Sequence, residues 1–154
     1  LFREPGQFGA LPNSELNISP VEGTSEGVFI GDVRVMGYGV IRDEPITIEV
    51  KDGEVSKISG GKAADYLRAT LASFNDRSAY NLAEFAVGLN PEARGYATNL
   101  EGLGKLGFAH HGIGSSYAIG GNVKAPCHID VIYKDASLEI DGALVLDKGE
   151  FVAS

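Results

Sequence analysis

The chain has 154 residues, of which 44% are hydrophobic and 22% are charged, a balance that is ordinary for a globular protein with one core. Its formal net charge of -8 argues against nucleic acid or an anionic membrane as the main partner, and no run of about 18 apolar residues predicts a membrane-spanning helix. The single cysteine, Cys127, excludes an internal disulfide and fits a reducing compartment, so we expect a cytoplasmic protein.

The N-terminal segment predicts a loop in a fragment of a longer chain. The first ten residues, LFREPGQFGA, lack the basic and apolar regions of a signal peptide, and no initiator methionine is present. Prolines 5, 12 and 20 and the scarcity of periodic apolar residues predict extended loop over residues 1–26. We therefore expect one domain over residues 1–154, cut from a longer protein, with an N-terminal domain missing.

The middle of the chain predicts strands followed by a helix. Residues 27–35 have a strand-like pattern, and residues 46–58 alternate on either side of Asp52-Gly53, which predicts a β-hairpin. In residues 61–74 the period changes, because Leu67, Leu71 and Phe74 fall at i, i+4 and i+7, as on an amphipathic helix.

The C-terminal half predicts mostly strands. Residues 83–89 alternate, with Glu84 on the side that carries small residues. Residues 100–106 predict a short helix, followed by a short strand and a glycine-rich loop. Two further strand runs cover residues 127–133 and 136–147, the second folded at Asp141-Gly142. Many antiparallel strands with one or two helices predict the α+β class.

The histidines form the most informative cluster. His110, His111 and His128 all lie within about 20 residues of one another, and His128 stands two positions before Asp130 in a predicted strand, so both side chains point to one face. Histidine with carboxylate oxygen suits zinc, iron or cobalt. The alternative is a structural pair in which Asp130 only orients His128, and the spacing leaves both interpretations open.

Two glutamates and a tyrosine have no role that composition alone can assign. Glu15 stands between two prolines and Glu84 on a predicted strand, so each could be a solvated surface residue. Tyr117 could be a packing residue.

Four segments in order resemble the aminopeptidase T family of metallopeptidases: LPNSELNISPVEGTSEG, LAEFAVGLNP, LGFAHHGIGSSYAIGGN and APCHIDVIY. The likeness runs from about Leu11 to Gly142 and corresponds to the C-terminal, metal-carrying part of those enzymes. It implies metal ligands at the following positions: Glu15, Glu84, His110, His128 and Asp130. It also implies a catalytic role for Tyr117 as hydrogen-bond donor to an oxyanion, and for Glu84 as ligand or general base. A one-place slip would exchange His110 and His111.

The main expectation is therefore a metal-dependent aminopeptidase-like hydrolase, in which one or two divalent ions (zinc, cobalt or manganese) activate water for amide hydrolysis. Its partner would be a small peptide or other small molecule, and a homodimer is compatible with the sequence.

One departure supports other functions. Lys105 occupies the position where the well-studied peptidases have a further glutamate, and a protonated lysine cannot bind metal. A related branch, the dihydroxypyridine dioxygenases, holds one ferrous iron, and His110, His128 and Asp130 would suit it. The third alternative is a non-catalytic metal-binding domain.

Overall fold

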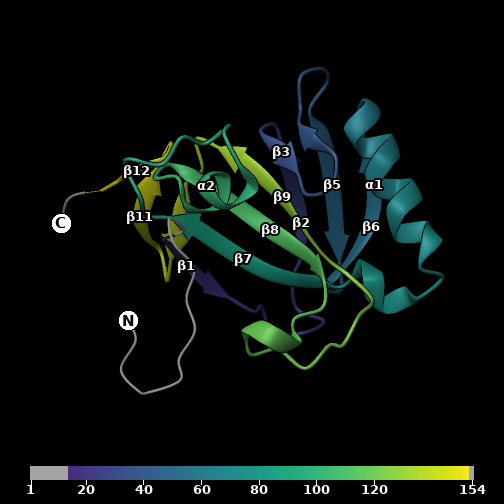
Figure 1. Cartoon of the computed structure of the whole chain (residues 1–154). Coiled ribbons are helices and arrows are strands. Elements are labelled where there is room, and N and C mark those ends of the chain that lie inside the picture. The colour runs from purple at the N-terminus through teal and green to yellow at the C-terminus, as the bar shows by residue number, and fades with distance from the viewer. Residues whose placement is uncertain (1–13, 153–154) are drawn as a thin grey trace, which may run out of the picture.

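The computed structural model describes residues 14–152, and these contain mostly antiparallel strands with two α-helices, which confirms the α+β class (Figure 1). The elements, including two short 3-10 turns, are β1 (Glu15–Ile18), β2 (Gly27–Gly31), β3 (Arg34–Val35), β4 (Gly39–Val40), β5 (Ile46–Lys51), β6 (Glu54–Ser59), α1 (Lys62–Ser73), η1 (Arg77–Tyr80), β7 (Leu82–Gly88), α2 (Asn99–Gly104), β8 (Phe108–Gly114), η2 (Tyr117–Ile119), β9 (His128–Lys134), β10 (Leu138–Ile140), β11 (Ala143–Asp147) and β12 (Glu150–Phe151).

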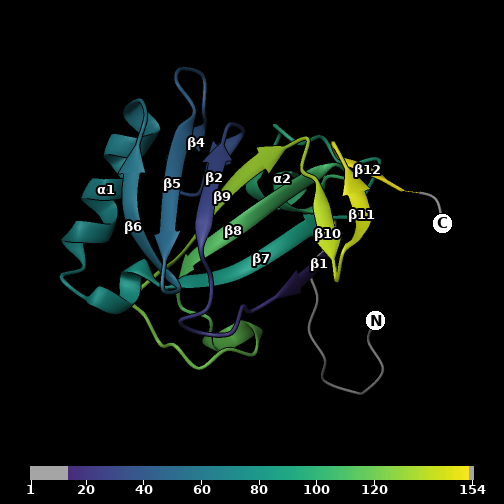
Figure 2. The ribbon, with the colours of Figure 1, turned by 180° about the vertical axis from the view of Figure 1, so that it is seen from behind.

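A six-stranded sheet forms the centre of the described chain. Its strand order is β1-β7-β8-β9-β3-β4, and Figure 1 shows β7, β8 and β9 side by side across the middle of the molecule. Two three-stranded sheets, β2-β5-β6 and β10-β11-β12, complete the fold. Figure 2 shows the second of these at the C-terminal end of the chain, beyond the ends of β7 and β8.

The main core lies between one face of the central sheet, the β2-β5-β6 sheet and α1. Leu67 and Leu71 of α1 are fully buried with Ile46 and Ile48 of β5, and Val131 of β9 joins the same cluster. The apolar positions predicted from helical spacing are therefore the ones that α1 buries. The predicted hairpin is also present, since Asp52 and Gly53 have positive φ angles of 51° and 74° between β5 and β6.

The opposite face of the central sheet is only partly covered. Here α2 packs over β7 and β8, and its Leu103 forms a small cluster with Val33 and Ile132. The C-terminal end of α2 lies directly on β7, because a Cβ at Gly88 would come within 2.2 Å of the Lys105 carbonyl oxygen. The part of this face beyond α2 carries the polar side chains described below.

Three sequence predictions were wrong in detail. The loop predicted over residues 1–26 contains β1, which adds to the edge of the sheet by pairing with β7; residues 1–13 lie outside the described chain. The strand predicted over 27–35 is divided between two sheets, because β2 pairs with β5 and β3 pairs with β9. The short strand β12 has no counterpart in the prediction. Among the described residues, no helix has both the length and the apolar character needed to cross a membrane.

Candidate metal centre

Three neighbouring strands bring two carboxylates and an imidazole together on the partly covered face. Gly112 of β8 pairs with Glu84 of β7 on one side and with Asp130 of β9 on the other, so the two acidic side chains flank a glycine. The register shifts between Leu82 and Glu84, and such a bulge bends the strand and re-aims the side chain that follows. His128 lies two residues before Asp130 on the same face, as its spacing predicts.

The glycine leaves the space in which these groups meet. A Cβ at Gly112 would lie 2.6 Å from His128 Nε2 and 2.9 Å from Glu84 Cβ, closer than side chains tolerate. Gly112 therefore permits the three side chains to converge.

His128 is held in one tautomer. Its Nδ1 lies 2.7 Å from the Ser115 carbonyl oxygen, and because a carbonyl can only accept, Nδ1 carries the hydrogen. A backbone carbonyl in this position is typical of histidines that bind metal through Nε2. Nε2 in turn lies 2.8 Å from Glu84 Oε2 and 3.2 Å from Asp130 Oδ1.

This arrangement requires a positive charge at its centre. In the neutral tautomer, the Nε2 lone pair would face two carboxylate oxygens. The carboxylates of Asp130 and Glu84 raise the pKa of His128 to about 10, because they favour the protonated imidazole over the neutral one. A divalent cation bound to Nε2 would supply the same positive charge between the two carboxylates.

The donors fit such an ion. Glu84, His128 and Asp130 each offer one ligand atom, and the three atoms lie within 4.8 Å of one another. Asp130 is only 4% exposed, and its Oδ1 meets the geometry of no hydrogen bond among the described residues but lies 3.2 Å from His128 Nε2. A proton or a metal ion on Nε2 would therefore compensate the charge of this buried carboxylate. The His128 side chain remains 31% exposed, so the group is open to solvent on one side.

A second group shares Glu84. Glu15, Glu84 and His110 also offer ligand atoms within 4.8 Å of one another, and His110 Nε2 lies 3.9 Å from Glu15 Oε2 and 4.0 Å from Glu84 Oε1. His110 is 1% exposed, and its Nδ1 has no partner within residues 14–152, so nothing there selects its tautomer. This group is more enclosed than the first and its imidazole is less well oriented.

The five predicted ligands thus lie on one face, but they divide into two groups. The set suggested for a single iron, His110, His128 and Asp130, does not form a group of its own, because neither group of described residues contains both histidines.

His111 lies on the other face of β8, as the predicted register requires. Its ring stacks on Phe29 at 4.3 Å between centroids and on Tyr133 at 5.6 Å, and the Tyr133 hydroxyl hydrogen-bonds to Nδ1 at 3.0 Å. Burial, followed by the charge of His110, lowers the pKa of His111 to about 4, and burial raises the pKa of Tyr133. His111 is therefore a neutral, half-buried packing residue.

Tyr117, predicted to be catalytic, lies on η2 in the loop after Ser115. Its side chain is 59% exposed, Lys124 Nζ lies 4.3 Å from its ring centroid, and its hydroxyl makes no hydrogen bond within the described chain. Its catalytic role stays a prediction.

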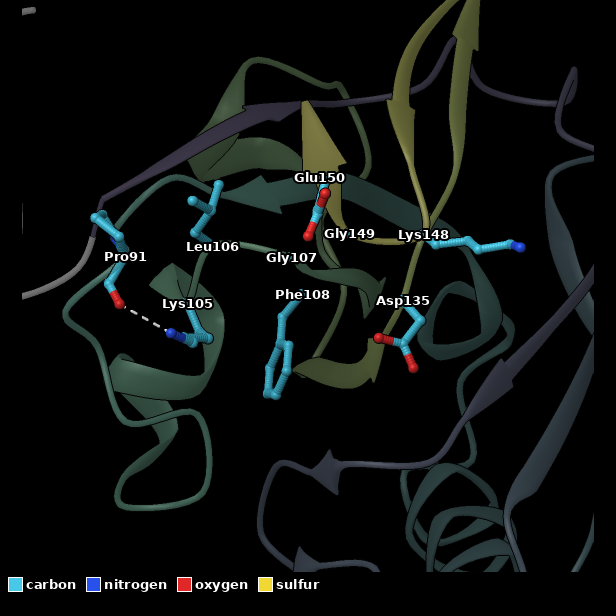
Figure 3. A pocket seen from close by; sticks show the side chains of 9 residues that line it. All are labelled: Pro91, Lys105, Leu106, Gly107, Phe108, Asp135, Lys148, Gly149 and Glu150. Carbon is cyan, nitrogen blue, oxygen red and sulfur yellow. Dashed lines mark hydrogen bonds between the residues drawn. The ribbon is translucent and has the colours of Figure 1, made fainter. Parts of the chain in front are cut away.

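Lys105 follows α2 and belongs to a different part of the surface. Its Nζ donates to the Pro91 carbonyl oxygen at 2.9 Å, and it lines an open pocket of about 310 Å³ with Phe108, Asp135 and Lys148 (Figure 3). The structure therefore gives Lys105 a loop-anchoring contact.

Sequence reasoning missed two contributors. Gly112 was not singled out, although a glycine at the centre of a strand is itself a signal of close approach. Ser115 contributes through its backbone carbonyl, for which no side-chain signal exists.

Comparison with known proteins gives a consistent result. Residues 1–153 match the family model described as NicX: 2,5-dihydroxypyridine 5,6-dioxygenase. The chain is 30% identical over 161 residues to the 2,5-dihydroxypyridine 5,6-dioxygenase of Pseudomonas putida strain KT2440, covering 97% of this chain and 46% of that protein. A solved structure of the dihydroxypyridine dioxygenase from Pseudomonas putida KT2440 superposes with a TM-score of 0.84 at 27% identity, covering 93% of this chain and 44% of that one. The chain thus spans less than half the length of both relatives.

These findings correct the assignment to aminopeptidase T. The hydrolase, metallopeptidase and protease functions that the resemblance implied are wrong, because the family match covers nearly the whole chain and names a dioxygenase. Glutamate, histidine and aspartate ligands serve hydrolytic and oxidative metal centres alike, so the motifs did not distinguish the reactions. The chain belongs to the NicX family of 2,5-dihydroxypyridine 5,6-dioxygenases.

Proposed function

We propose that this chain supplies the metal centre of a dioxygenase that opens a hydroxylated pyridine ring, with 2,5-dihydroxypyridine as the first substrate to test. The observation that carries the proposal is the convergence of Glu84, His128 and Asp130 in a chain of the NicX family, with His128 oriented by the Ser115 carbonyl oxygen. The proposed ion is ferrous iron, which would supply the binding and activation of dioxygen.

The residues of the chain have separate tasks in this proposal. Glu84, His128 and Asp130 hold the ion, and the Ser115 carbonyl keeps His128 Nδ1 protonated so that Nε2 is free to bind. The exposed side of His128 leaves room for the substrate. Glu15 and His110 lie on the other side of Glu84 and have no task in this proposal.

The second group is the less favoured location for the ion. His110 is almost completely buried, and a ring-opening centre needs coordination positions that substrate and oxygen can reach. Glu15, Glu84 and His110 would enclose an ion without such access. The proposal also includes three expectations from the sequence. The substrate is a small molecule, the protein is cytoplasmic, and a further N-terminal domain accompanies this one.

The test is oxygen uptake by the iron-loaded protein with 2,5-dihydroxypyridine, followed together with loss of the ring's ultraviolet absorbance. Asp130→Asn removes one carboxylate charge from the centre, and we expect it to lower the rate by at least about a hundredfold, comparable to loss of a single catalytic group. Asp135→Asn is the matched control. Asp135 has a φ of 55°, which asparagine tolerates, and lines the separate pocket of Figure 3.

The proposal predicts that Asp135→Asn retains the rate and that Asp130→Asn does not. Equal activity in the two variants would contradict it, as would the absence of oxygen uptake from fully metal-loaded wild-type protein.

A further inference from the structure

The donor set of the candidate centre departs from the usual mononuclear iron site. Non-haem ferrous oxygenases typically use two imidazoles and one carboxylate. Here the accessible group has one imidazole, from His128, and two carboxylates, from Glu84 and Asp130. The second imidazole on this face, that of His110, lies on the other side of Glu84 from His128. Its Nε2 is 4.0 Å from Glu84 Oε1, whereas His128 Nε2 is 2.8 Å from Glu84 Oε2.

We infer that Glu84 is the residue that determines which metal the centre prefers, and that it shifts the preference toward Mn²⁺. Carboxylate oxygens suit Mn²⁺, whereas imidazole nitrogens favour the later divalent ions, including Co²⁺ and Zn²⁺. A centre with two anionic oxygens and one nitrogen therefore discriminates less strongly against Mn²⁺ than a centre with two nitrogens. This inference depends on the metal centre of the proposed function but not on its reaction.

The position of Glu84 supports a direct role in binding the ion. The residue is only 4% exposed, so bulk water does not compete for its carboxylate. Its Oε2 lies 2.8 Å from His128 Nε2, and Oδ1 of the buried Asp130 lies 3.2 Å from the same nitrogen. Any ion that replaces the proton on Nε2 therefore meets the Glu84 oxygen.

The neighbours of position 84 in the sheet have small side chains or none. Glu84 pairs with Gly112, which has no side chain, and the next residue on the same face of β7 is Ala86. Glu84→His would convert the group to two imidazoles and one carboxylate.

The experiment measures dissociation constants for Mn²⁺ and for Co²⁺, each added alone to chelator-treated protein, by isothermal titration calorimetry. Mn²⁺ binding is also followed by the loss of the free-ion signal in electron paramagnetic resonance. In Glu84→His we expect the affinity for Co²⁺ to rise relative to Mn²⁺ by about tenfold, a change within the range that substitutions around a metal produce. An unchanged ratio, or a shift toward Mn²⁺, would overturn the inference.

Glu84→Gln keeps the shape and one oxygen of the side chain but removes the charge, so the inference can be tested even if the histidine variant folds poorly. We expect it to weaken Mn²⁺ binding more than Co²⁺ binding. Equal weakening of the two would overturn the inference.

Glu15→Gln is the matched control, since it makes the same change in the adjacent group. We expect it to leave both constants as they are in the wild type. If Glu15→Gln shifts the metal ratio as Glu84→Gln does, the ion is held by the second group and the inference fails.

The outcomes separate the inference from the proposed function. The predicted metal ratios without ring opening would leave the inference standing and remove the reaction. Ring opening by the wild type, with an unchanged ratio of Mn²⁺ to Co²⁺ affinity in both Glu84 variants, would support the reaction and remove the inference.

Discussion

His128 combines two interactions that determine what its ring can do. Nδ1 donates to the Ser115 carbonyl oxygen, which leaves Nε2 to face the oxygens of Glu84 and Asp130. Without a proton or a cation at this point, three electron-rich atoms would oppose one another. The contact of His128 with Glu84 of β7 and Asp130 of β9 therefore requires a cation at Nε2. We expect a metal ion to replace the proton there.

Gly112 provides the residue-scale test of this geometry. We expect Gly112→Ala to weaken Mn²⁺ binding by at least about ten- to a hundredfold, because the added methyl group would lie 2.6 Å from the nitrogen that binds the ion. Calorimetric titration of the folded variant measures the change. Overpacking of this kind also costs about 1–3 kcal/mol of stability, so folding is verified first by circular dichroism.

Gly142→Ala is the control for this substitution. Gly142 has a φ of 81° and nothing within 4 Å of its added Cβ, so the change strains a distant turn but meets no side chain. It should leave the Mn²⁺ dissociation constant as it is. A Gly112→Ala protein that binds Mn²⁺ as tightly as Gly142→Ala would show that the ion lies elsewhere.

The sequence predicted which side chains share a face of the sheet better than how they group there. Strand alternation was sufficient to place His128 and Asp130 on one face, because the two residues belong to the same element. The pairing of Glu84 with Gly112 depends on a register that only the folded sheet defines, including its bulge beside Leu82. The reaction could not be read from the ligands, since the same donors serve hydrolases and oxygenases.

At the scale of elements, the aromatic cluster joins the two main sheets. Phe29 of β2 stacks on His111 of β8, and Phe85 of β7 and Tyr133 of β9 surround the same imidazole. The residue is half-buried and its imidazole is neutral, with a pKa lowered to about 4. Packing of β2 against the face of β7, β8 and β9 opposite the candidate ligands therefore depends on an uncharged histidine.

This dependence predicts loss of stability in mild acid. Between pH 6.5 and 4 the unfolded chain takes up a proton at His111 that the folded chain does not, so the free energy of unfolding falls as the pH falls. Above pH 6.5 both states are neutral at this ring and the contribution is constant. Urea unfolding at several pH values measures the slope in the wild type and in His111→Gln, which cannot titrate.

Taking the difference between the two proteins cancels the titration of the other groups. The difference should shrink as the pH is lowered from 6.5 toward 4, because only the wild type loses stability through His111. Parallel curves would show that His111 does not titrate as its surroundings suggest.

Elements with strong local patterns were predicted and those that depend on distant pairing were not. The hairpin at Asp52-Gly53 and the helix α1 follow from turn chemistry and apolar spacing within the segment itself. β1 has two exposed apolar residues, Leu16 and Ile18, and becomes a strand because the edge of β7 is available to pair with it. The division of β2 from β3 likewise reflects two different partners.

At the scale of the whole molecule, the hydrophobic core and the candidate metal ligands lie on opposite faces of the central sheet. One face of the central sheet packs into the core with α1 and the β2-β5-β6 sheet, and the other face carries the acidic residues and two histidines beside α2. The rigid core thus positions donors from β7 and β9, strands that lie on either side of β8. The chain belongs to the NicX family but spans less than half the length of its relatives. Ring opening is therefore a proposal for the protein that contains this candidate centre.

The most direct test of the account is an anomalous-difference map from crystals of the protein grown with Mn²⁺. The account predicts a peak bounded by Glu84, His128 and Asp130, on the side of Glu84 away from His110. A peak between Glu15 and His110, or a map without a peak on this face of the sheet, would contradict it.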